Sequence, residues 1–76
     1  MTRLPYRLTG EFIALNDLLK VTGVCASGGA GKALVATGTV SVDGAMETRK
    51  TCKIRPGQTV VVGNVEISVL PADPRT

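Results

Sequence analysis

The stretch SGGAGKALVATGTVSVDG, residues 27–44, constrains the fold more than any other part of the chain. It predicts a helix that begins after Ser27, because a serine hydroxyl can accept a hydrogen bond from an amide of the first helical turn. Gly38 stands where helices commonly end on a residue with left-handed backbone angles. Between these two ends, four residues recur at helical spacing: Ala30, Ala33, Leu34 and Thr37.

A strand and a tight turn are expected directly after this helix. Val40 and Val42 alternate with polar residues, which is the pattern of a half-buried strand. Asp43-Gly44 favours a two-residue hairpin turn, since both central positions of that turn need a positive φ. Residues 45–48 can therefore pair back on the strand.

A second helix is expected before residue 27. One of its faces is apolar and carries Leu15, Leu18, Leu19 and Thr22. The opposite face is expected to point to solvent and carries Asn16, Asp17 and Lys20. Gly23 ends this helix, and the link over residues 24–26 is so short that the two helices must cross and pack, with Val24 in the angle between them.

The two ends of the chain predict less regular structure. Residues 1–10 are expected to form a mobile arm, whose Arg3 and Arg7 either touch an anionic partner or stay solvated. No apolar run follows these basic residues, so neither a signal peptide nor a membrane anchor is expected, and the predicted location is cytoplasmic. Residues 11–14 can form a short strand, in which Phe12 is expected to lie in the core.

The C-terminal part predicts a turn and a second hairpin. Pro56-Gly57 is typical of a type II turn. Residues 59–62 are expected to pair with residues 65–70 across Gly63-Asn64. Residues 71–76 are expected to form a frayed tail.

These elements together predict an α+β fold, with two packed helices on one face of a small, mostly antiparallel sheet. A single domain over residues 11–70 contains them all, and a chain of 76 residues has room for one small core. Nine Lys and Arg residues against six Asp and Glu give a net charge of +3, which favours an anionic partner.

Cysteine and histidine usage argues against catalysis and metal binding. The chain has no histidine, and Cys25 and Cys52 stand alone, so a zinc site lacks ligands and a nucleophile lacks its usual base. Both cysteines are interpreted as small packing residues with reduced thiols, although the sequence leaves a disulfide open. We therefore expect no enzyme, no metal and no other cofactor.

Three glycines, at positions 28, 29 and 31, fall in the first turns of the helix after Ser27. Each costs about 0.5–1 kcal/mol relative to alanine in a helix, so either another backbone packs close or a ligand approaches the amides. Free amides at a helix start, next to Lys32, favour an anion. The run resembles the end of a nucleotide-binding P-loop, but Ala26 and Ala33 replace the required Gly and Ser or Thr, so nucleotide hydrolysis is not expected.

The densest charge cluster is the run RKTCKIR, residues 49–55, with four basic residues in seven and one nearby acid, Glu47. Arg49 and Lys50 point to opposite faces if this run is a strand, whereas Lys53 and Arg55 share a face. Each of them, like Lys32, either contacts an anion or is simply solvated. The residues expected to bind an anionic partner are Ser27, Gly28, Gly29, Lys32, Thr48, Arg49, Lys50, Lys53 and Arg55.

From Leu15 to Val60 the chain resembles the S-four RNA-binding domain, also called the alpha-L motif. The matching positions are Leu15, Leu19, Gly23, Ser27, Leu34, Gly38, Val40, Val42, Asp43, Gly44, Ile54 and Gly57. The stretch VDGAMETRK, which ends at Lys50, resembles more narrowly the small stand-alone bacterial S-four-like proteins of the YbcJ type.

Four positions depart from the pattern of this family. The family's first Arg is Ala14 here, its Asp is Asn16, the Arg after the Ser is Gly28, and the packing Ala is Gly31. Gly28 can therefore offer only a backbone contact. If the fold is as the resemblance implies, residues 49–55 lie near the second helix and form one basic face with Lys32.

The resemblance implies a non-catalytic protein that binds structured RNA, such as rRNA or tRNA, in translation, with the ribosome or an RNA-modifying enzyme as a partner. Tyr6 and Phe12 are the only aromatic residues, so no stacking platform for unpaired bases is expected. Recognition is instead expected to use shape and phosphate contacts. The alternative is a protein-interaction module that docks through a sheet edge and has no nucleic-acid role.

Overall fold

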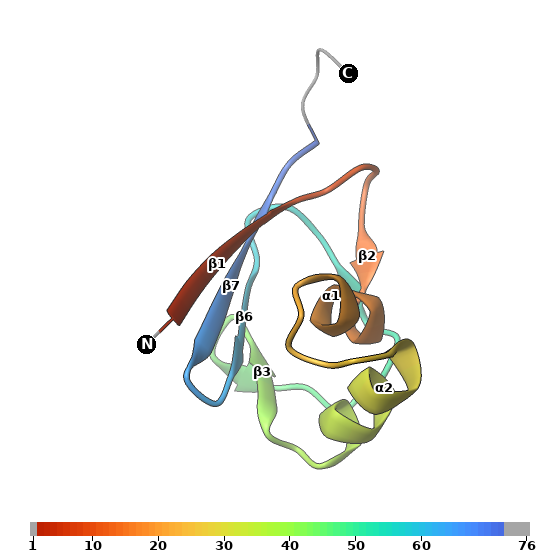
Figure 1. The fold of residues 1–76 in the computed structure, drawn as a ribbon. Coiled ribbons are helices and arrows are strands. Elements are labelled where there is room, and N and C mark those ends of the chain that lie inside the picture. Colours follow the sequence, from red (N-terminus) through yellow and green to blue (C-terminus); the bar gives the residue numbers. More distant parts are fainter. Residues whose placement is uncertain (1, 73–76) are drawn as a thin grey trace.

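The computed structural model describes residues 2–72 and contains two helices beside a sheet (Figure 1). In chain order the elements are β1 (Thr2–Arg7), β2 (Ile13–Ala14), α1 (Leu15–Val21), α2 (Gly28–Ala36), β3 (Val40–Val42), β4 (Ala45–Met46), β5 (Lys53–Ile54), β6 (Thr59–Val62) and β7 (Val65–Leu70). The expected α+β fold with two packed helices is confirmed. No helix within residues 2–72 is long and apolar enough to cross a membrane.

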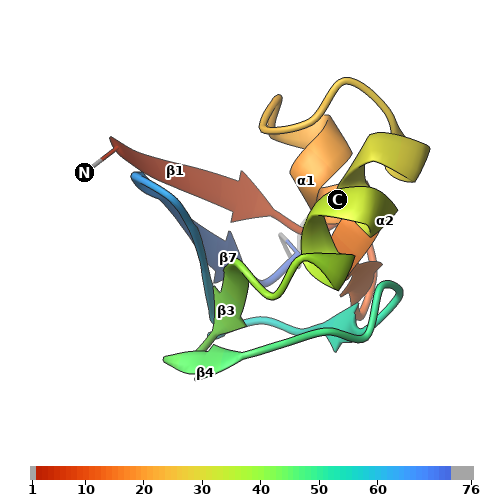
Figure 2. The ribbon, with the colours of Figure 1, turned by 90° about the horizontal axis from the view of Figure 1, so that it is seen from below.

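The main sheet has five strands in the order β1-β7-β6-β3-β4. All neighbours are antiparallel except β1 and β7, which run parallel from Thr2 opposite Val65 to Arg7 opposite Leu70. Strands β2 and β5 form a separate antiparallel ribbon. Figure 2 shows the helices on one side of the molecule and β4 at the far edge of the sheet.

The N-terminal segment is a strand of the sheet, so the expectation of a mobile arm over residues 1–10 is wrong for residues 2–8. Leu4 and Tyr6 are half-buried, Leu8 is buried, and the Leu8 amide donates a hydrogen bond of 3.0 Å to the Leu70 carbonyl. These apolar residues alternate with polar ones and with Pro5, as a half-buried strand requires. The expected boundary at residue 11 therefore cuts through the folded unit, while residues 73–76 of the expected tail lie outside the described part.

The core fills the space between the helices and the sheet. Its fully buried residues are Leu15, Leu18 and Leu19 of α1, Val35 of α2, Ile54 of β5 and Val40, Val60 and Ile67 of the main sheet. The prediction that Phe12 lies in this core is wrong, because its side chain is 43% exposed. The prediction that Asn16 faces solvent is also wrong, because only 5% of this residue is exposed.

The predicted ends of α2 and the first hairpin are confirmed. The Ser27 hydroxyl accepts a hydrogen bond of 3.1 Å from the Ala30 amide, and Gly38 adopts a φ of 79° after the helix. Asp43 and Gly44 both have positive φ, at 52° and 86°, as a two-residue turn between β3 and β4 requires. The second hairpin pairs β6 with β7 as expected.

Candidate nucleic-acid interface

The helix α2 and the segment between β4 and β5 line one open hollow on the surface. In Figure 2 this segment runs from β4 past α2 toward the other end of the molecule. The lining residues are Lys32, Thr48, Arg49, Lys50, Thr51, Cys52 and Lys53. None of the ion pairs within residues 2–72 includes Lys32, Lys50 or Lys53. Their ammonium charges are thus available to a ligand.

Backbone hydrogen bonds attach the basic segment to the first turn of α1. The Leu15 amide donates to the Cys52 carbonyl at 2.8 Å, and the Asn16 amide donates to the Lys50 carbonyl at 3.1 Å. Ala14 at the N-cap supplies no side-chain bond, so these carbonyls satisfy amides that the helix itself cannot pair. The position of Lys50 is therefore set by the start of a buried helix.

The helix α2 packs directly on the backbone of the same turn. A Cβ atom at Gly31 would lie 2.6 Å from the Asn16 carbonyl oxygen, which no side chain tolerates. Close packing therefore explains the glycine at position 31. Because Asn16 contacts both α2 and the Lys50 carbonyl, it joins the two elements and brings Lys32 to the same hollow as Lys50.

The burial of Asn16 also follows from this crossing of the helices. Its Nδ2 donates a hydrogen bond of 3.4 Å to the Gly28 carbonyl, so the side chain points to α2 and not to solvent. Within the described residues, its Oδ1 is buried without a hydrogen-bond partner. The helical pattern of the sequence shows the apolar face of α1 but not the polar contact that α2 makes beside it.

The start of α2 lies outside the residues that line the hollow. A Cβ atom at Gly28 would lie 3.5 Å from Asn16 Nδ2 and 3.6 Å from Asp17 Oδ1, and one at Gly29 would lie 3.9 Å from Ser27 Oγ. These are ordinary contacts, so packing does not require a glycine at either position. The Asp17 carboxylate beside this helix end opposes the approach of an anion there. The structure thus groups Lys32 with residues 48–53, and not with residues 27–29.

Arg49 is held by a carboxylate at the edge of the hollow. Its Nε and Nη2 donate to the two oxygens of Glu47, both at 3.0 Å, and its backbone amide donates to Oε2 at 2.9 Å. These hydrogen bonds, first of all those from the Arg49 side chain, lower the pKa of Glu47 to about 2. The same pair raises the pKa of Arg49. One of the cations predicted to bind is therefore already neutralised in part.

The thiol of Cys52 adjoins this pair. Burial, and then the negative charge of Glu47, raise the pKa of Cys52. Its Sγ donates a weak hydrogen bond of 3.5 Å to Glu47 Oε1. Cys25 and Cys52 are both free thiols, and the described residues contain no cluster of His, Cys, Asp or Glu that could hold a metal ion. The cysteines therefore pack, as expected, beside the core.

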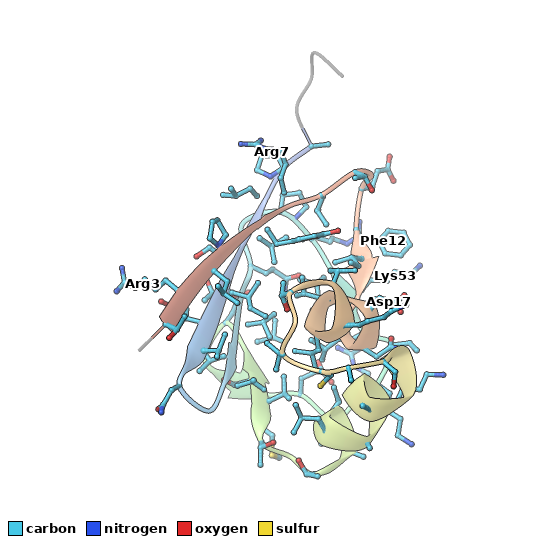
Figure 3. The ribbon with its side chains drawn as sticks, viewed as in Figure 1. Arg3, Arg7, Phe12, Asp17 and Lys53 are labelled. Carbon is cyan, nitrogen blue, oxygen red and sulfur yellow. The ribbon has the colours of Figure 1, made fainter. Side chains whose placement is uncertain are left out.

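The outer face of the β2–β5 ribbon carries an aromatic ring and two cations. Ile13 pairs with Ile54, which is fully buried, so the residues on either side of Ile54 point outward. Lys53 Nζ lies 4.9 Å and Arg55 Cζ lies 5.8 Å from the centre of the Phe12 ring. Figure 3 shows Phe12 and Lys53 next to each other at the outer edge of the molecule.

This register explains why the core prediction failed for Phe12. Ile13 occupies the inward position of the ribbon, so its neighbour Phe12 must face outward, and no signal within residues 11–14 tells which of the two is buried. Lys53 and Arg55 share a face, as expected for an extended segment. Arg3, in contrast, lies at the opposite edge of the molecule from Phe12, and Arg7 lies at the upper end in this view (Figure 3). Arg3 pairs with Glu66 at 3.0 Å, and Arg7 donates to the Pro71 carbonyl at 3.0 Å.

The chain thus combines a helix pair with a mixed sheet and gathers Lys32, Lys50 and Lys53 around one hollow. The family model of the S4 domain matches residues 6–70, and the chain belongs to this family. The match begins at Tyr6, so it includes only the last two residues of β1.

Two relatives and one solved structure show which members of this family resemble the chain. "Putative RNA-binding protein YbcJ" of Escherichia coli (strain K12) is 48% identical over 58 residues, which cover 76% of this chain and 83% of the relative. "Uncharacterized protein YbcJ" of Shigella flexneri gives the same values. The solution structure of YbcJ from E. coli, which is described as revealing an alpha-L motif involved in RNA-binding, superimposes with a TM-score of 0.65 at 41% identity. That match covers 92% of this chain and 87% of the other.

Proposed function

We propose that this chain is a non-catalytic RNA-binding protein that recognises structured RNA, such as rRNA or tRNA, through phosphate contacts. The observation that carries the proposal is the shared hollow of Lys32 from α2, Lys53 from β5 and Lys50 from the segment before β5. The naming of a relative at 48% identity as an RNA-binding protein supports it. In this proposal, Arg49 and Thr48 contact the same RNA from the rim of the hollow.

Structured RNA suits this surface because the backbone that carries its cations is anchored to the helices. The backbone that carries Lys50 and Lys53 is attached to α1 by two hydrogen bonds, and Lys32 follows a glycine that is in direct contact with α1. Cations on an anchored backbone suit phosphates whose spacing is itself set by a folded RNA. Thr48 and Thr51 add hydroxyl groups that can donate to phosphate oxygens.

The remaining predicted residues take secondary positions in this proposal. Arg55 extends the basic surface past the hollow, and residues 27–29 offer only backbone amides and a hydroxyl that already caps α2. We place the protein in the cytoplasm, bound to rRNA in the ribosome or to tRNA, alone or beside an RNA-modifying enzyme.

Charge-reversal variants test the proposal. Binding of a tRNA transcript and of an rRNA hairpin is measured by fluorescence anisotropy for wild type, K32E and K50E. The matched control is K20E, because Lys20 is exposed on α1 but does not line the hollow. We expect K32E and K50E each to weaken binding by about tenfold or more, and K20E to change it little.

Salt dependence provides a second measurement on the same proteins. About five phosphate contacts give a slope of roughly −3.5 to −4.5 in a plot of log K against log salt, and loss of one contact reduces it by about 1. A slope near zero for wild type, or equal losses in K20E and K50E, would contradict the proposal.

A further inference from the structure

Phe12 differs from the other large apolar side chains that the structure exposes. Within residues 2–72 these are Phe12, Val21 and Met46, at 43%, 53% and 68% exposure. Single exposed apolar residues need no explanation by themselves. Phe12, however, is aromatic, and two cations, Lys53 and Arg55, approach its ring. The sequence predicts no stacking platform because it holds only two aromatic residues, but a single exposed ring is enough to stack on one base.

The ring borders the proposed RNA interface. Lys53 lines the hollow and also lies 4.9 Å from the centre of the Phe12 ring, so one side chain connects the two features. The backbone beneath Phe12 is fixed by the pairing of Ile13 with Ile54, whose side chain is fully buried. The ring is therefore carried by an anchored ribbon and not by a free loop.

The charges around the ring select the kind of partner. An apolar protein surface that covered Phe12 would also desolvate Lys53 and Arg55 without giving them a counter-charge, which is unfavourable. A nucleotide satisfies both requirements, because its base offers a π-face to the ring and its phosphate offers a negative charge to the cations. The surroundings of Phe12 thus fit an unpaired nucleotide better than a protein.

We propose that Phe12, flanked by Lys53 and Arg55, stacks on one unpaired nucleobase that adjoins the structured RNA held in the hollow. This inference rests on the proposed function and adds to it a preference for a bulged or looped nucleotide beside a stem. Stacking tolerates any base, since every base has a π-face, so the preference concerns pairing and not sequence.

The test compares two RNA hairpins with the same stem, one continuous and one with a single bulged 2-aminopurine. Base–aromatic stacking predicts that wild type binds the bulged hairpin roughly 5- to 150-fold more tightly and quenches the 2-aminopurine fluorescence. The matched variants are F12L, which keeps an apolar side chain but has no π-face, and F12W, which keeps the ring. We expect F12L to lose the preference and the quenching, and F12W to retain both.

The controls separate this inference from the proposed function. F12L removes no charge, so its affinity for the continuous hairpin and its salt slope should equal those of wild type, whereas K50E should bind both hairpins more weakly. Equal binding of the bulged hairpin by wild type and F12L, or the absence of quenching by wild type, overturns the stacking inference and leaves the proposed function standing. If wild type binds neither hairpin, both are overturned.

Discussion

Gly31 is the residue on which the crossing of the two helices depends. A methyl group there would lie 2.6 Å from the Asn16 carbonyl oxygen, and the three nearest atoms are all backbone atoms of Asn16, which cannot turn aside. We expect G31A to lower the free energy of unfolding by about 1–3 kcal/mol, as overpacked sites do. Urea denaturation followed by circular dichroism measures this loss.

The matched control for Gly31 is Gly29, in the same helix. A Cβ atom at position 29 meets only Ser27 Oγ at 3.9 Å, so G29A should gain the helix propensity of alanine and stabilise the fold by about 0.5–1 kcal/mol. Changes of opposite sign in the free energy of unfolding of G31A and G29A would confirm the close contact at Gly31. Equal changes in the two variants would contradict that contact.

Glu47 makes the stability of the protein depend on pH in acid. Its pKa falls from an ordinary value of 4.5 to about 2 in the folded chain, chiefly because Arg49 donates hydrogen bonds to the carboxylate. A carboxyl group with a lowered pKa stabilises the fold fully above its unfolded value and loses that effect as the pH falls through its folded value. The stabilisation by Glu47 should therefore be complete above about pH 5 and should fade toward pH 2.

The variant E47Q isolates this effect. We expect wild type to melt at a higher temperature than E47Q near neutral pH, and the difference to shrink steadily between pH 5 and pH 2. E11Q serves as the control, because Glu11 is exposed and belongs to neither ion pair of the described part. A difference for E47Q that does not change with pH would show that the carboxylate acts by packing and not by charge.

At the scale of elements, residues 2–7 form strand β1 of the sheet, where the sequence predicts a mobile arm. Leu8, directly after this strand, is 3% exposed and belongs to the hydrophobic core. We expect L8A to lower the free energy of unfolding by about 2–5 kcal/mol, as other large-to-small core substitutions do. The neighbouring T9A should be nearly neutral, since Thr9 is exposed. If L8A were as mild as T9A, residues 2–8 would be an arm after all.

The elements that could be predicted from the sequence are those whose signals are local. The Ser27 cap, the stop at Gly38 and the Asp43-Gly44 turn each depend on a few neighbouring residues, and each is confirmed. The strand β1 could not be predicted in this way, because its partner β7 lies near the other end of the chain. Parallel pairing leaves no hairpin turn in the sequence to indicate it.

At the scale of the whole molecule, the candidate site also combines features that are visible in the sequence with features that only the fold creates. The charged run at residues 49–55 is visible in the sequence, and the family resemblance led us to expect Lys32 beside it. The role of Asn16 was not predictable, because it arises only when α2 crosses α1 and the basic segment bonds to the same turn. The outward position of Phe12 was not predictable either, because it depends on the register of β2 against β5.

The parallel pairing of β1 with β7 also has a consequence for how the protein is made. Within the described part of the chain, residues 2–7 pair only with Val65–Leu70, which are synthesised much later. A nascent chain can therefore form its helices while β1 is still unpaired, because β1 must wait for residues 65–70. The pairing of β1 with β7 joins residues that are far apart in the sequence, and such long-range contacts slow folding.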